Sequence, residues 1–301
     1  MRASFPLSLV LCGLIAAGSG CGAGGTAHRA EVETARAERL AKLQEPDGWL
    51  TLIGLHFLKD GANTVGSAKD NDVVIASGPA RVGTVTVAAD GKVTIEVAPG
   101  AGIKVGGEER RTAELRWSEP RTPTLVTAGT VTLFAVDRGG KKALRVKDSA
   151  SKRRTQFVGL DYFPIDPAWR IEARWEAFEK SRLMPITTML GQTAPEPIPG
   201  KAVFVRDGKT YELLPIDEGR DVPLFFVISD TTSGKETYGG CRFLYVPWPK
   251  EGETKIVLDF NLAENPPCAF TPFSTCPLPP KENRLPFALN VGEKNYRGAH
   301  D

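Results

Sequence analysis

Residues 237–293 read TYGGCRFLYVPWPKEGETKIVLDFNLAENPPCAFTPFSTCPLPPKENRLPFALNVGE and decide the fold of the C-terminal half. Short apolar segments alternate here with Gly and Pro, a pattern typical of strands joined by turns. Polar side chains of the kinds that brace loops or build a site are spread through the stretch. They are Tyr238, Arg242, Asp259, Asn261, Asn265, Asn283 and Glu293.

This polar set has three interpretations. Asp259 and Asn261 are two residues apart in a strand-like run, so they share one face. In the first interpretation Arg242 pairs with Asp259 or Glu293 while the Asn side chains cap turns. In the second, all seven residues line a pocket for a small polar or carboxylate ligand, with Arg242 as donor. In the third, Asp259 and Glu293 form the carboxylate pair of a hydrolase-like enzyme, or bind a hard metal with Asn261.

The composition narrows the choice between these interpretations. Lys and Arg number 38 and Asp and Glu 36, a balance that does not predict a nucleic-acid partner. The three histidines are His28, His56 and His300, and no His-based metal motif, nucleophile elbow or phosphate loop occurs. We therefore expect no cofactor and no metal, and we interpret His56 as a structural residue of an apolar strand.

The N-terminus is predicted to be a targeting segment. A short positive start precedes the apolar run of residues 7–17, which is too short to span a bilayer. Small residues and then Cys21 follow, which resembles the end of a bacterial lipoprotein signal, although Gly18 stands where a large aliphatic residue is usual. We expect a signal peptide over residues 1–20, lipidation of Cys21, a tether over 21–30 and a periplasm-facing protein anchored at the cell envelope. The alternative is a soluble secreted protein.

Three cysteines remain after this segment. In an oxidising compartment Cys268 and Cys276 are expected to form a disulfide across a short Pro-containing loop. Cys241 is then a buried thiol without chemistry. With no CxxC motif and no nearby His, these cysteines do not predict a zinc site.

The chain after the tether is predicted to be mainly β. An Ala-, Glu-, Arg- and Leu-rich segment predicts a helix over residues 31–45, followed by a β-sandwich over 46–152. A second antiparallel β domain with Pro-rich loops, a sandwich or a partly closed barrel, is expected over 153–301. In this domain the sequence predicts strands at 171–178, 186–190, 202–206, 209–215 and 224–229, and a loop at 195–200.

The first of these domains resembles a forkhead-associated domain. The segments that carry the resemblance are NTVGS (63–67), NDVVI, GTVTV, VTIEV and VGG. That family binds phosphothreonine, yet Ser67 stands where it has Arg, and residues 79–83 (PARVG) lack its Ser and His. We therefore expect this domain to have the architecture of a forkhead-associated domain but not to bind phosphothreonine peptides.

Nearly the whole chain resembles a bacterial family known as domain of unknown function 1684. The resemblance rests on GWLTLIGLHFL (48–58), NTVGS (63–67), YFPIDPAWRIEA (162–173), TYGGCRFL (237–244), LDFNLAENPPCAFTPFSTCPLPPKENRL (258–285) and VGE (291–293). It implies a family without an assigned activity. Cys241 stands where a small residue such as Gly is expected in that family, which supports its interpretation as incidental.

Overall fold

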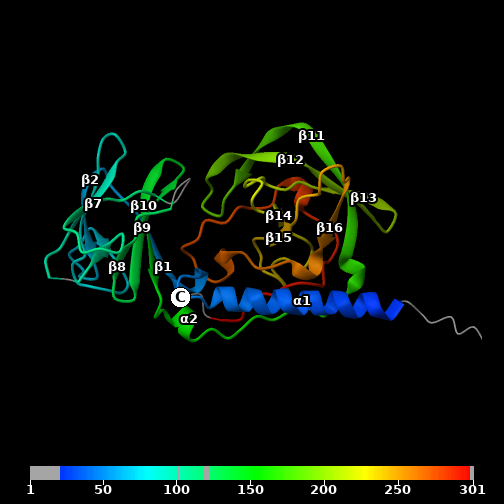
Figure 1. The fold of residues 1–301 in the computed structure, drawn as a ribbon, viewed down its shortest axis with the longest axis horizontal. Helices are drawn as coiled ribbons and strands as arrows, with labels where there is room; N and C mark the ends of the chain where they lie inside the picture. The colour runs from blue at the N-terminus through cyan, green and yellow to red at the C-terminus, as the bar shows by residue number, and fades with distance from the viewer. Residues whose placement is uncertain (1–20, 101, 118–121, 299–301) are drawn as a thin grey trace, which may run out of the picture.

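The computed structural model describes residues 21–100, 102–117 and 122–298. The expected signal peptide over residues 1–20, and the side chain of the expected lipidation residue Cys21, lie outside this part. The fold is mainly β, as predicted, with one long N-terminal helix. Figure 1 shows two β-rich halves side by side, with the helix running along the edge of the C-terminal half. Among the described helices, none has the length and hydropathy that crossing a bilayer requires.

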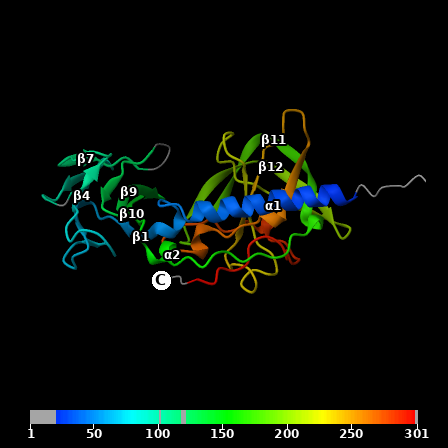
Figure 2. The same ribbon diagram turned by 60° about the horizontal axis from the view of Figure 1, so that its bottom comes forward.

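Helix α1 spans Cys21–Leu43, so residues 21–30 are helical rather than the flexible tether expected. The extension has a packing cause. His28 and Val32 are buried, and such tertiary contacts stabilise a helix that its local sequence alone would not specify. Figure 2 shows α1 lying across the C-terminal half.

The first half is the predicted sandwich of two five-stranded sheets. One sheet has the order β1 (Leu52–Phe57), β10 (Lys141–Asp148), β9 (Val131–Arg138), β8 (Val126–Ala128) and β6 (Lys104–Val105). The other has the order β3 (Val73–Val74), β2 (Gly61–Gly66), β4 (Gly83–Val87), β5 (Val93–Val97) and β7 (Thr112–Glu114). Val65, Ile95, Leu133 and Leu144 belong to one core between the sheets, because alternate residues of each strand face inward.

The second half is built on a sheet in the order β13 (Lys209–Leu213), β12 (Thr193–Arg206), β11 (Arg170–Thr187) and β16 (Lys255–Asp259). In Figure 1 the long strands β11 and β12 arch over the hairpin of β14 (Leu224–Ile228) and β15 (Arg242–Val246). Every residue of β14 is buried. Phe226 and Leu244 of the hairpin share a core with Phe204 and Leu258 of the sheet.

Residues 195–200, expected as a loop, belong to β12, so this prediction was wrong. Pro195 and Pro197 pair with β11, whereas β13 pairs with β12 only from Ala202 onward. The proline-containing part of β12 is therefore an edge, and a proline tolerates an edge because its missing N–H costs no ladder hydrogen bond there. The strand expected at 171–178 is present as the first part of β11.

Short helical turns connect and complete the two halves. They are η1 (Trp49–Thr51), α2 (Lys152–Thr155), η2 (Pro167–Trp169), η3 (Phe260–Leu262), η4 (Pro267–Ala269) and η5 (Lys281–Asn283). The halves also contact each other directly: Thr271 Oγ1 donates to the Leu52 carbonyl at 3.0 Å, and Gln192 Nε2 donates to the Arg138 carbonyl at 3.3 Å. These contacts fix the walls of the cleft described below.

Candidate functional site

Arg242, at the start of β15, is 1% exposed and its charge is met by a carboxylate that the sequence analysis did not select. Its Nη2 lies 2.8 Å from Asp230 Oδ2 and 3.0 Å from the Leu289 carbonyl, and its Nη1 donates to the Val291 carbonyl at 2.5 Å. The side chain thus holds the C-terminal segment against the hairpin. Its buried ion pair with Asp230 must stay intact, because losing one partner would leave the other charge uncompensated in the interior.

Two of the three selected asparagines brace backbone segments. Asn283 Oδ1 accepts from the Leu214 N–H at 2.8 Å, and its Nδ2 donates to the carbonyls of Leu214 and Val227. Asn261 exchanges hydrogen bonds in the same way with both backbone groups of Asp166. Buried amides in this geometry satisfy peptide groups that no strand partner reaches.

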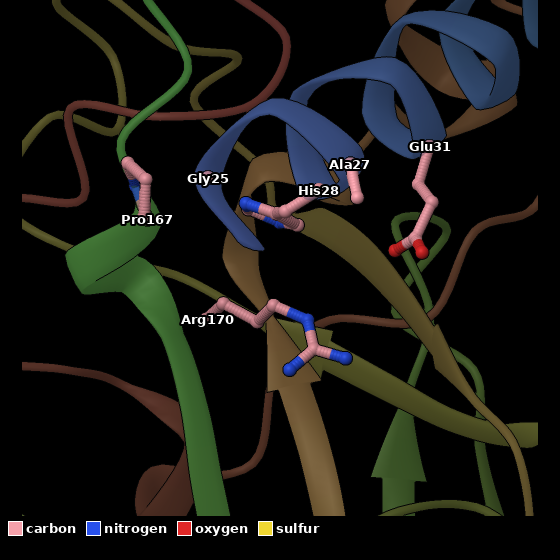
Figure 3. Close-up of a pocket in the computed structure, with 6 residues that line it drawn as sticks. All are labelled: Gly25, Ala27, His28, Glu31, Pro167 and Arg170. Atoms are coloured by element: carbon pink, nitrogen blue, oxygen red, sulfur yellow. The ribbon is translucent and has the colours of Figure 1, made fainter. Parts of the chain in front are cut away.

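Asp259 has a partner that sequence reasoning missed. His28 Nε2 of α1 lies 2.6 Å from Asp259 Oδ2, and His28 is 6% exposed. His28 also borders a cavity of about 360 Å³ under the start of α1, where Figure 3 shows it together with Glu31, Pro167 and Arg170. The sequence did not indicate a role for His28, because this residue lies in the segment expected to be a tether.

Glu293 and Asn265 belong to a third network, centred on Arg39 of α1. Arg39 Nε lies 3.1 Å from Glu293 Oε1 and 3.2 Å from Glu264 Oε2, so two carboxylates share one guanidinium. The Asn265 N–H donates to Glu293 Oε2 at 2.8 Å, and Arg39 Nη2 donates to the Asn265 carbonyl at 2.8 Å. Arg39 and Glu264 carried no sequence signal, because each looks like an ordinary charged residue of a helix or a loop.

Tyr238 is half-buried and packs with the cluster of Leu43, Phe270 and Tyr296. Burial raises the pKa of its hydroxyl to about 12. The seven selected residues are therefore distributed over separate networks. None of them is among the residues that line the cleft described next.

A cleft of about 400 Å³ lies between the sandwich and the C-terminal half. The sandwich side contributes Trp49, Arg138 of β9 and Arg145 of β10. The opposite side carries carboxylates and aromatic rings, and α1 adds Arg39. These residues are Glu196, Glu218, Glu264, Phe225, Phe243 and Tyr245. A concave site with an apolar wall and several charged groups is the usual form of a small-molecule site.

The rings of the cleft form one packed group. Phe225 of β14 stacks on Tyr245 of β15 with centroids 5.1 Å apart, and it meets Phe243 edge-on at 4.7 Å. Phe225 and Phe243 are buried, whereas Tyr245 is 41% exposed and presents its ring to the solvent side. The wall is thus held rigid by its buried members while one ring remains accessible.

Glu264 is the titratable residue of the cleft that best suits proton exchange. Burial raises the pKa of Glu264 to about 7, with Glu293 adding to the rise and Arg39 opposing it. Glu293 accepts hydrogen bonds from Asn265 and Arg39, whereas Glu264 has only the shared guanidinium among its described partners. Burial raises the pKa of Glu293 as well, but its hydrogen bonds from Asn265 and Arg39 favour the ionised form. Glu264 accepts fewer hydrogen bonds, so it is the carboxyl of the pair that faces the cleft and exchanges its proton near neutral pH.

The cysteine prediction is corrected. Cys268 and Cys276 are free thiols in this structure, not the expected disulfide. Each sulfur instead accepts a hydrogen bond from the other residue's N–H, at 3.2 and 3.3 Å, and Ser274 Oγ donates to Cys268 Sγ at 2.9 Å. These three bonds hold the loop without a covalent link. Cys241 is a buried free thiol, and burial raises its pKa.

Residues 155–294 match the model of the family described as Protein of unknown function (DUF1684). The C-terminal half of the chain thus contains a DUF1684 region. A solved relative is an uncharacterized protein from gene locus rrnAC0354 of Haloarcula marismortui, determined by solution NMR. It is 31% identical with a TM-score of 0.40, and the match covers 49% of this chain and 82% of that one.

A second solved structure, Rad53 1–466 in complex with AMP-PNP, matches at 11% identity and a TM-score of 0.15, covering 58% of this chain and 39% of that one. A score this low does not establish a shared fold. No curated protein matches the chain. The DUF1684 region contains Glu196, Glu218 and Glu264 of the cleft, whereas Arg138 and Arg145 precede it.

Proposed function

We propose that this protein is a binding module that holds a small polar ligand in the cleft between its two halves. The observation that carries the proposal is the lining of the cleft. Charged side chains of both signs and a rigid aromatic wall converge there on about 400 Å³ of open space. Bound ligands of this size gain affinity from buried apolar contact and orientation from a few charged groups.

Four of the seven residues selected from the sequence hold the elements that line this cleft without lining it themselves. Glu293 and Asn265 hold Arg39, which in turn lies beside Glu264 at the cleft. Arg242 and Asn283 fix the hairpin that carries the aromatic wall. Their role in the proposal is to position the lining residues, not to touch the ligand.

A thermal-shift screen of the full chain against sugars, amino acids, nucleotides and divalent ions tests the proposal. A ligand at one hundred times its dissociation constant stabilises the folded state by about 2.7 kcal/mol, a readily measured rise in melting temperature. The rise should be lost in Tyr245→Leu and kept in Tyr245→Phe. If no compound shifts the melting temperature, or if Tyr245→Leu responds like the wild type, the cleft is not the binding site.

We also propose that the protein is exported and held at the cell envelope by lipid on Cys21, facing the periplasm. The support is the charged start, the apolar run and the small residues before Cys21. Labelling of cells with a radioactive fatty acid should mark the wild-type protein and leave Cys21→Ser unlabelled. Equal labelling of both would contradict lipidation, and an unlabelled protein in the medium would favour simple secretion.

A second function, a hydrolase-like enzyme, is favoured by one observation. The pKa of Glu264, raised to about 7 by burial, suits a general acid or base, and Glu264 faces a cleft. The carboxylate pair considered from the sequence is less suited, because Asp259 is bonded to His28 and Glu293 to Arg39. Among the described residues, no three His, Cys, Asp or Glu side chains form a group that could hold a metal ion.

Chromogenic ester, amide and glycoside substrates test this alternative. Turnover that disappears in Glu264→Gln, while that variant still unfolds in a single cooperative thermal transition, would establish the enzyme. Unchanged turnover in Glu264→Gln would remove Glu264 from any catalytic role.

A further inference from the structure

The two walls of the cleft differ in the charge of the side chains that they contribute. Arg138 and Arg145 come from neighbouring strands of the sandwich, whereas the three glutamates come from the C-terminal half. A ligand that carries both signs of charge can satisfy both walls at once. A ligand with one sign meets at least one wall of like charge, which lowers its affinity.

The aromatic group indicates which end of the ligand lies where. Phe225, Phe243 and Tyr245 line the same cleft as Glu264. Aromatic faces attract cations and repel anions, and aromatic cages are the usual receptors for alkylammonium groups. Rings and a carboxylate together therefore fit an organic ammonium better than a small hydrated metal ion, which needs several oxygen ligands.

We infer that the cleft recognises small zwitterions and that the ligand's ammonium group takes the place of the proton on Glu264. This inference rests on the proposed function and names its ligand class. The ammonium lies between the Tyr245 ring and Glu264, and the acidic group points toward Arg138 and Arg145. Arg138 lines the cleft, and its buried Nε has no hydrogen-bond partner among the described residues, so the fold leaves this guanidinium partly unsatisfied.

The shared guanidinium explains why a proton is displaced. Glu264 is faced by Arg39 and Lys42 of α1, by Glu293, and by Tyr245 of β15. Arg39 is committed to the fully buried Glu293 as much as to Glu264. An ammonium beside Glu264 adds a positive charge to those of Arg39 and the less strongly acting Lys42, and the carboxyl proton passes to solvent. Binding and proton release are then one event.

Calorimetric binding to the full chain, with two matched probes, tests the inference. Glycine betaine and 3,3-dimethylbutanoate have the same shape and the same carboxylate, but only the former has a positive charge. We expect betaine to bind at least about tenfold more tightly than 3,3-dimethylbutanoate at pH 8. Its affinity should fall about tenfold between pH 8 and pH 6 as Glu264 regains its proton. L-Phenylalanine, with a primary ammonium, should follow the same pH dependence.

Variants locate the effect. Glu264→Gln should abolish the pH dependence, and Tyr245→Leu should weaken betaine binding while Tyr245→Phe preserves it. Glu172→Gln, which removes an exposed carboxylate paired with Lys255, is the matched control and should behave as wild type. A single cooperative thermal unfolding transition establishes that each variant is folded.

Two outcomes overturn the inference. One is equal affinity for betaine and its uncharged-tail analogue, or affinity that does not change with pH. The other is no binding of either zwitterion at millimolar concentration. If another compound of the thermal-shift screen still binds in a Tyr245-dependent way, the proposed function stands and only the ligand class is wrong. If nothing binds, both fall.

Discussion

Arg242 and Asp230 form an ion pair at 2.8 Å in which both side chains are enclosed by protein. Removing one partner leaves a buried charge without its counterion. We expect Arg242→Ala to lower the free energy of unfolding by about 3–5 kcal/mol. Urea denaturation measures this change. Arg111→Ala, which breaks an exposed pair with Glu96, is the control and should cost at most about 1 kcal/mol. Equal losses in the two variants would contradict a structural role for Arg242.

Glu264 should make folding stability depend on pH. Its pKa is raised from 4.5 to about 7 by burial, so the folded state keeps a proton that the unfolded state loses first. The contribution of Glu264 to the free energy of unfolding is therefore greatest below pH 4.5 and falls as the pH rises to about 7. Above that pH the contribution no longer changes. Since Gln does not ionise, Glu264→Gln should gain about 1–3 kcal/mol relative to wild type between pH 5 and pH 8. Denaturant titrations at both pH values measure the difference, and a difference that stays constant would refute the assignment.

His28 should contribute to the docking of α1 through Asp259. A double-mutant cycle with His28→Ala and Asp259→Ala is expected to give a coupling energy of about 1–3 kcal/mol, because the 2.6 Å bond is buried. Arg29→Ala, in the adjacent exposed pair with Glu33, serves as the control. A coupling energy near zero would mean that α1 docks without this pair.

The three described thiols outside α1 should differ in reactivity. The hydrogen bond from the Cys276 thiol, together with that from Ser274, lowers the pKa of Cys268 to about 6, although burial opposes the shift. Burial raises the pKa of Cys241. Iodoacetamide at pH 7 should therefore label Cys268 before Cys241 and Cys276, since the thiolate is the nucleophile. Mass spectrometry of the native protein reads out the order. Ser274→Ala should slow labelling of Cys268, and faster labelling of Cys241 would contradict the account.

The sequence predicted the parts of the fold whose signals are local. Short apolar runs bounded by turn residues located β13 and β14, because strand periodicity is a nearest-neighbour property. The prolines of residues 195–200 led to the wrong prediction of a loop, since proline is excluded from a strand only where its N–H is needed. The helical start at Cys21 was missed because its stability comes from contacts more than two hundred residues away, as between His28 and Asp259.

The same limit applies to the site. Selecting polar residues within one stretch found Asp259, Asn265 and Glu293, which the structure uses as supports. The cleft itself takes its residues from α1, the sandwich and the C-terminal half. No periodicity or motif connects Arg39 with Glu264, or Arg145 with Tyr245, because the tertiary fold alone brings them together.

The most direct test of the cleft as a zwitterion site is the structure of the full chain crystallised with saturating glycine betaine. The account predicts betaine with its trimethylammonium group between the Tyr245 ring and the Glu264 carboxylate, and its carboxylate directed toward Arg138. Betaine found instead under α1 beside His28 and Arg170, or a cleft left empty at saturation, would contradict it.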